Sequence, residues 1–287
     1  CNVTLTHRRA VLPNTYVALI FLSFFFVSVM AHCRERGDEM IVGDLSHIHL
    51  AGVHSATVTT LGDGTFDLNQ LISKIRHGYP DPHYPRSRLV CITVCVSHSK
   101  LPSVADKFVL AVHMDRTRVM NAAVALGIQP SAILQHCHSV SVCLSKGLGA
   151  PVGTMLGGSK DFIQRAVRVC KALGGGLRQS GVLAAAGKIA LSDMIGRLEE
   201  VHRKARSFAQ ALLQCDPPLY QLDLNTMSPA EFCEQMAGGV KVLMFPHVGG
   251  TVRAVWHLGI SEEDTQLAIL KAQFVAQQHK PKSNRAS

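Results

Sequence analysis

Aromatic and charged residues are scarce in this sequence. Phenylalanine, tryptophan and tyrosine together make up 6% of the 287 residues, and charged residues make up 17%. The net charge is nevertheless +9. The basic residues are scattered, whereas a nucleic-acid-binding surface gathers them among aromatic side chains. The composition therefore argues against a nucleic-acid partner and favours solvated basic faces together with an active site that binds anions.

Paired cysteine motifs and complete sets of metal ligands are also missing. The nine cysteines include no C-x-x-C spacing, and the closest pair, Cys91 and Cys95, lies in an apolar run. His47 and His49 form a His-x-His pair, but a third ligand at suitable spacing is lacking, so we expect no metal. These absences disfavour a disulfide framework and indicate reduced thiols.

No apolar stretch has the length of a conventional transmembrane helix. The run Val17–Met30 contains about 14 nearly unbroken apolar residues, whereas a membrane span needs about 20. The run is a signal or anchor segment, a buried helix, or non-native sequence joined to a truncated chain, and we expect the last. We therefore expect a cytoplasmic protein, with membrane association through Val17–Met30 as the alternative.

The most informative stretch is a predicted strand followed by a lysine and glycines. Ser139–Leu144 alternates small polar with apolar residues, which predicts a short buried strand. Lys146 then lies at the carboxyl end of that strand. A lone lysine in such a loop is usually a solvated one. If it is partly desolvated, however, its neutral amine can form a Schiff base.

A second predicted strand adds an acid to this lysine. Lys107–Asp115 is an apolar run that ends in a carboxylate, and Arg118–Leu126 has helical spacing closed by Gly127. The order strand, helix, strand predicts parallel neighbours, with Asp115 and Lys146 at the same carboxyl edge of a sheet. A carboxylate that pairs with a pyridinium nitrogen and a Schiff-base lysine are the two protein groups that pyridoxal phosphate needs.

Two segments also resemble a known family. Residues 145–153 (SKGLGAPVG) and 171–181 (KALGGGLRQSG) are similar to low-specificity L-threonine aldolase, a pyridoxal-phosphate-dependent family with the aspartate aminotransferase fold. The similarity extends, with gaps, from about Ala31 to about Gln273. It implies an α/β protein with a mostly parallel sheet in a large domain and a small α+β domain at the C-terminus.

The predicted organisation follows from this resemblance and from the hydrophobic pattern. We expect an apolar segment at 1–30, a large domain at 31–206, a small domain at 207–278 and a basic tail at 279–287. The predicted elements are strands at 40–44, 89–96, 220–224, 241–245 and 251–257, helices at 68–77, 161–173, 181–206, 228–236 and 261–278, and a linker at 101–106.

The resemblance also implies which residues bind the cofactor. Lys146 would hold pyridoxal phosphate as an imine, and Asp115 would keep its ring nitrogen protonated. His47 would stack on the ring and help proton transfer. Lys171 and Arg178 would approach the phosphate, partly across a subunit interface.

The substrate and reaction are implied in the same way. Arg118 and Arg253 would bind the carboxylate of a β-hydroxy amino acid, as a bidentate arginine can. The implied activity is a carbon–carbon lyase that cleaves L-threonine or L-allo-threonine to glycine and acetaldehyde. The implied assembly is a homo-oligomer, a dimer or tetramer.

Departures from the family pattern leave another class of function open. Where the family has Asp-Gly-Ala-Arg, this chain has Asp115-Arg116-Thr117-Arg118, and no Ser-Gly-Thr phosphate motif precedes Val27. An arginine in place of the glycine beside the ring, and a smaller phosphate site, would weaken cofactor binding. The alternatives are therefore a degenerate, inactive homologue, which is either unstable or serves only as an interaction surface, and a membrane-tethered variant.

Overall fold

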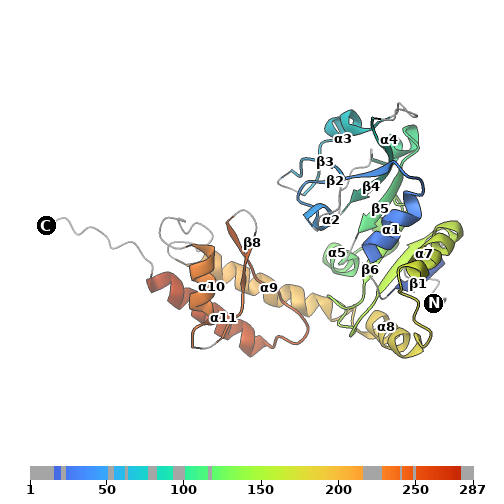
Figure 1. The fold of residues 1–287 in the computed structure, drawn as a ribbon. Helices are drawn as coiled ribbons and strands as arrows, with labels where there is room; N and C mark the ends of the chain where they lie inside the picture. The colour runs from blue at the N-terminus through green and yellow to red at the C-terminus, as the bar shows by residue number, and fades with distance from the viewer. Residues whose placement is uncertain are drawn as a thin grey trace. The chain divides into compact units, whose positions relative to one another are not determined.

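The structure is a computed structural model that describes residues 16–20, 24–50, 55–61, 64–76, 83–92, 101–115, 118–215, 228–239, 241–247 and 250–278. The chain forms two compact units, Cys1–Ile195 and Gly196–Ser287. The first contains a sheet with helices packed on it, and the second is mostly helical (Figure 1). Arg116 and Thr117, and the strand predicted at 220–224, lie outside the described residues.

The described strands of the first unit form one sheet in the order β1-β7-β6-β5-β4-β2-β3. They are β1 (Tyr16–Ile20), β2 (Asp38–Gly43), β3 (Ala56–Val58), β4 (Arg86–Ile92), β5 (Ala111–Asp115), β6 (Ser139–Cys143) and β7 (Thr154–Gly158). Strand β7 is antiparallel to both of its neighbours, and the pairs from β6 through β3 are parallel. The α/β class with a mostly parallel sheet is therefore confirmed.

The first unit contains several helices, and capping accounts for where one of them begins and where another ends. They are α1 (Phe24–His32), α2 (His47–Leu50), α3 (Leu68–Lys74), α4 (Leu101–Lys107), α5 (Val119–Leu126), α6 (Pro130–Leu134), α7 (Lys160–Ala172) and α8 (Gly181–Asp193). The Asp67 side chain accepts a hydrogen bond from the Asn69 amide at the start of α3. Gly127 ends α5 in the left-handed region that glycine tolerates best. The predicted helix closure at Gly127 is therefore confirmed.

The apolar run near the N-terminus contains two separate elements. Its first part forms β1, which pairs with β7, and its second part belongs to α1. Val27 and Ala31 of α1 are fully buried, in one cluster with Phe162 and Ala166 of α7. The α1 part of the run thus packs in the core of the first unit. None of the helices in the described ranges is long and apolar enough to cross a membrane.

Two helical predictions were wrong. The predicted linker at 101–106 is helix α4, because Leu101 and Ala105 lie one turn apart and are both buried. The single helix predicted at 181–206 is two helices, α8 and α9 (Leu198–Leu213). Gly196 lies in the break, and glycine has low helix propensity.

The strands of the second unit also differ from prediction. The strand expected at 241–245 is β8 (Phe245–His247), because the amide of Val242 donates instead to the carbonyl of Met236 at the end of α10 (Pro229–Ala237). The strand expected at 251–257 is limited to β9 (Thr251–Arg253), which pairs with β8. Helix α11 spans Glu262–Gln278, close to the predicted 261–278. Ser228 begins α10 with a capping box, in which its side chain accepts from the Glu231 amide and the Glu231 side chain accepts from the Ser228 amide.

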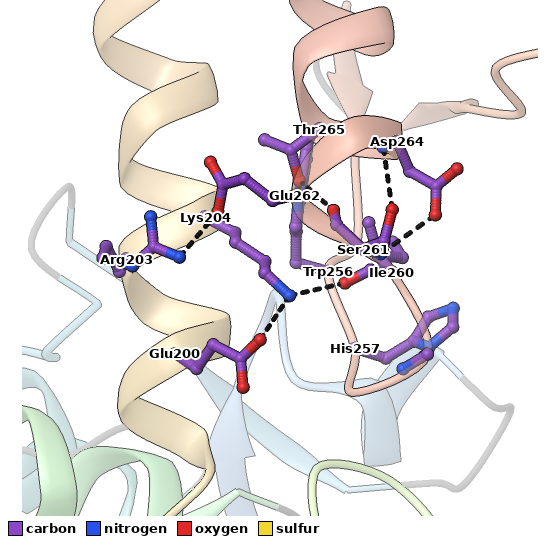
Figure 2. A network of polar contacts seen from close by, with 11 residues as sticks. Glu200, Arg203, Lys204, Trp256, His257, Ile260, Ser261, Glu262, Asp264 and Thr265 are labelled. Carbon is purple, nitrogen blue, oxygen red and sulfur yellow. Dashed lines mark hydrogen bonds and ion pairs between the residues drawn. The ribbon is translucent and has the colours of Figure 1, made fainter.

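A buried lysine connects α9 to the segment that precedes α11. Lys204 is 5% exposed, and its Nζ donates to Glu200 Oε1 at 2.5 Å and to the carbonyl of Ile260 at 2.8 Å (Figure 2). Trp256 Nε1 donates to Thr265 Oγ1 at 3.1 Å in the same network. Because both acceptors compensate the buried ammonium, the chain between β9 and α11 is held against α9. This chain continues directly from Arg253.

Candidate functional site

A buried carboxylate lies at the carboxyl end of β5. Asp115 is 8% exposed and pairs in register with Ser141 of β6. Ser141 Oγ donates to Asp115 Oδ1 at 2.8 Å. Within the described residues, this is the hydrogen bond that Asp115 accepts, and no cationic group forms an ion pair with it. The carboxylate therefore lies in a polar but incompletely compensated environment.

The charges around this carboxylate come from two further elements. Burial raises the pKa of Asp115, while the hydrogen bond from Ser141 and the positive charges of Lys146 and His47 lower it. Lys146 and His47 are therefore near enough to act on the carboxylate electrostatically. The structure thus brings together three residues that are far apart in sequence, each just beyond or at the end of a parallel strand.

Lys146 lies in a tight turn after β6. The amide of Gly149 donates to the carbonyl of Lys146 at 3.1 Å, and the amide of Leu144 donates to the carbonyl of Gly153 at 2.9 Å. The Lys146 side chain is exposed. A Cβ atom at Gly147 would lie 2.4 Å from Oδ1 of Asn121, so the turn packs closely against the Asn121 side chain of α5, which would have to move to admit a larger residue.

Replacing Gly147 with alanine should therefore destabilise the protein by about 1 kcal/mol, the low end of the usual range for overpacking, because the end of the Asn121 side chain can move. The measurement is the free energy of unfolding from chemical denaturation. Gly196→Ala is the matched control, because nothing lies within 4 Å of a Cβ there. Adding Asn121→Ala should recover part of the loss. Equal unfolding free energies for Gly147→Ala and Gly196→Ala would contradict the assigned packing.

His47 reaches the same region from β2. It is the first residue of α2 and is exposed, while the next residue, Ile48, is fully buried and anchors the short helix. Asp44 Oδ1 accepts hydrogen bonds from the amides of Leu45 at 2.9 Å and Thr60 at 2.8 Å. These contacts fix the turn that presents His47 to the carboxyl edge of the sheet.

Two exposed cations flank a glycine bend between α7 and α8. Lys171 lies in the last turn of α7, and its Nζ is 3.0 Å from the position of a Cβ atom at Gly176. Arg178 follows in the turn before α8 and is also exposed. In the described part of the chain, neither cation forms an ion pair with Asp115, whose hydrogen-bond donor is Ser141. The two positive side chains at this bend could therefore bind an anion.

The two arginines proposed to bind substrate lie on different units. Arg118 is exposed at the N-cap of α5, three residues after Asp115. Arg253 is exposed on β9 in the second unit. Each is therefore available to solvent for a carboxylate.

The residues around Asp115 fit the ring of pyridoxal phosphate. A protonated pyridine nitrogen would supply the cation that a buried carboxylate needs. Lys146 supplies an amine whose charge already acts on that carboxylate, and His47 supplies an imidazole. Lys171 and Arg178 supply cations for a phosphate.

Sequence reasoning did not identify Ser141 and Asn121 as parts of this site. Ser141 compensates the buried carboxylate, and Asn121 supports the turn that carries Lys146. The alternation in Ser139–Cys143 placed Ser141 on one face of its strand. Its partner could be identified only from the register between β5 and β6.

Comparison with a model of the beta-eliminating lyase family gives a match over residues 26–227. The chain is 36% identical over 276 residues to a probable low-specificity L-threonine aldolase 2 of Arabidopsis thaliana, covering 85% of this chain and 78% of that protein. It is also 36% identical over 275 residues to the low specificity L-threonine aldolase of Escherichia coli strain K12, covering 87% and 80%.

A solved structure has a similar fold. The threonine aldolase of Leishmania major superposes with a TM-score of 0.69 and covers 92% of this chain and 85% of that one. The sequences are 14% identical in this superposition. The likeness therefore establishes the architecture, and the two sequence relatives establish the kinship.

Proposed function

The chain belongs to the beta-eliminating lyases and, within them, to the low-specificity L-threonine aldolase family, and we propose that it cleaves L-threonine and L-allo-threonine to glycine and acetaldehyde. The observation that carries this proposal is the buried carboxylate of Asp115, which lies at the same carboxyl edge of the parallel strands as Lys146 after β6 and His47 after β2. That set supplies the charge, the amine and the imidazole that a pyridoxal-phosphate lyase requires.

Five residues would hold the cofactor. Lys146 would bind it covalently, Asp115 would keep its ring nitrogen protonated, and His47 would lie over its ring. Lys171 and Arg178 would bind its phosphate. When bound, pyridoxal phosphate supplies an electron sink for the electron pair released from a broken Cα–Cβ bond.

The remaining groups act on the substrate. Arg118 and Arg253 would bind the carboxylate and so orient the amino acid with its Cα–Cβ bond toward the cofactor ring. His47 is the imidazole that we assign to proton transfer at the substrate. We further propose a homo-oligomer, as the family resemblance implies, in which Lys171 and Arg178 serve the phosphate partly across a subunit interface.

The test uses the purified full chain with added pyridoxal phosphate. Borohydride reduction followed by peptide mass spectrometry should place the cofactor mass on Lys146. The loaded protein should release glycine and acetaldehyde in equal amounts from L-threonine and from L-allo-threonine. Absence of a reduced adduct at Lys146, or adduct formation without either product, would refute the proposed activity and favour an inactive homologue.

A further inference from the structure

Two buried serines of β6 each hold a titratable side chain of β5. Ser139 and Ser141 lie on the same face of the strand because residues two apart point the same way. Ser139 Oγ lies 2.7 Å from His113 Nδ1, and Ser141 Oγ lies 2.8 Å from Asp115 Oδ1. Ser141 is fully buried. The two hydroxyls therefore form equivalent contacts, one of them at the carboxylate of the site.

We propose that Ser141 is a positioning residue of the lyase, whose hydroxyl orients the Asp115 carboxylate toward the cofactor ring. The proposal rests on the proposed function, because it assigns Asp115 to the ring nitrogen. The end torsion of an aspartate side chain is broad and roughly two-fold, so a carboxylate at a strand end is not oriented by its own rotamer. A donor on the neighbouring strand, in register, restricts that rotation.

The same hydrogen bond controls the charge of the carboxylate. Lys146 acts on the charge of Asp115 from the turn after β6, His47 acts on it from the start of α2, and Cys91 of β4 is the further titratable group nearby. Burial and the nearby Asp115 charge raise the pKa of the Cys91 thiol, which is therefore neutral. Ser141 is uncharged and stabilises the ionised carboxylate at every pH in the working range. Removing the hydroxyl should therefore raise the pKa of Asp115 further.

The experiment compares Ser141→Ala with Ser139→Ala in the full chain. Pyridoxal phosphate is titrated by absorbance between pH 5 and pH 8, and thermal stability is measured alongside. Ser141→Ala should weaken cofactor binding about tenfold at neutral pH, as expected for loss of a hydrogen bond to a charged group. As the pH is lowered, the affinity of Ser141→Ala for pyridoxal phosphate should begin to decrease at a higher pH than that of the wild type. Ser139→Ala should change stability and leave the pH profile of binding in place.

Two results would overturn the positioning role. One is a Ser141→Ala variant that binds the cofactor within twofold of the wild-type affinity. The other is an equal loss of cofactor affinity in both serine variants at every pH. Ser141→Cys keeps a similar volume and a weak hydrogen-bond donor, so it tests the proposal if the alanine variant does not fold. It should shift the pH profile of cofactor binding in the same direction by a smaller amount. An unchanged pH profile would refute the proposal. Asp115→Asn distinguishes failure of the positioning role from failure of the proposed function. If this variant binds pyridoxal phosphate as tightly as the wild type, the proposed function itself is refuted.

Discussion

A Lys146→Ala chain should retain no borohydride-reducible pyridoxal phosphate and should lose on the order of 10⁴-fold of its lyase activity. In the described part of the chain, Lys146 is the amine whose charge acts on Asp115. No other described lysine has an electrostatic effect on that carboxylate, so we expect Lys146 to be the covalent attachment point. Activity is measured as acetaldehyde release from L-threonine, and attachment by the mass of the reduced protein.

Two further variants make this result specific. Lys146→Arg keeps the positive charge but cannot be deprotonated, so it should be as inactive as the alanine variant. Lys160→Ala removes an exposed lysine two residues after Gly158, which pairs with Ser139 at the opposite end of β6. It should retain full activity. Covalent cofactor that persists in Lys146→Ala would show that another lysine is the attachment point.

The central part of this site could be predicted from sequence because it depends on one topological rule. Asp115 and Lys146 each end or follow a buried strand, and a helical segment separates them, so parallel pairing places them at one edge. The pairing of β5 with β6 is confirmed. The antiparallel strand β7 and the short helix α6 were not predicted, because short apolar runs carry little periodicity.

Features that depend on packing could not be predicted. Helix α4 and the break between α8 and α9 depend on which face meets the core, which local propensity does not determine. The contact of Asn121 with Gly147 joins a helix to a turn 26 residues away along the chain, and no spacing rule anticipates it. Ser141 was visible as a buried serine, but its partner was determined by strand register.

A second strong prediction comes from two histidines that contact Ser139, the buried His113 and the partly buried His32. His32 Nε2 lies 2.6 Å and His113 Nδ1 lies 2.7 Å from Ser139 Oγ. His32 also stacks on Phe162 with 4.6 Å between ring centroids. Among the described buried side chains, Nε2 of His113 is the polar atom without a hydrogen-bond partner. Burial, reinforced by His32, lowers the pKa of His113 to about 3.

This lowered pKa predicts acid sensitivity. The folded protein keeps His113 neutral, whereas the unfolded chain binds a proton near pH 6.5, so the unfolded state binds more protons as pH falls. The stability is therefore complete above about pH 6.5 and is lost between pH 6.5 and pH 3. The expected slope is about 1.4 kcal/mol per pH unit for one histidine, which gives about 2 kcal/mol at pH 5. Burial also lowers the pKa of His32 to about 3, which acts in the same direction.

The variant His113→Leu should isolate this contribution. Leucine removes the titrating ring and its unpaired nitrogen. Between pH 7.5 and pH 5, the unfolding free energy of the variant should therefore decrease by about 2 kcal/mol less than that of the wild type. The measurement is urea denaturation at both pH values, and exposed His136→Leu is the matched control. A wild-type decline that His113→Leu leaves unchanged would mean that His113 is protonated in the folded protein or titrates alike in both states. The acid sensitivity would then arise elsewhere.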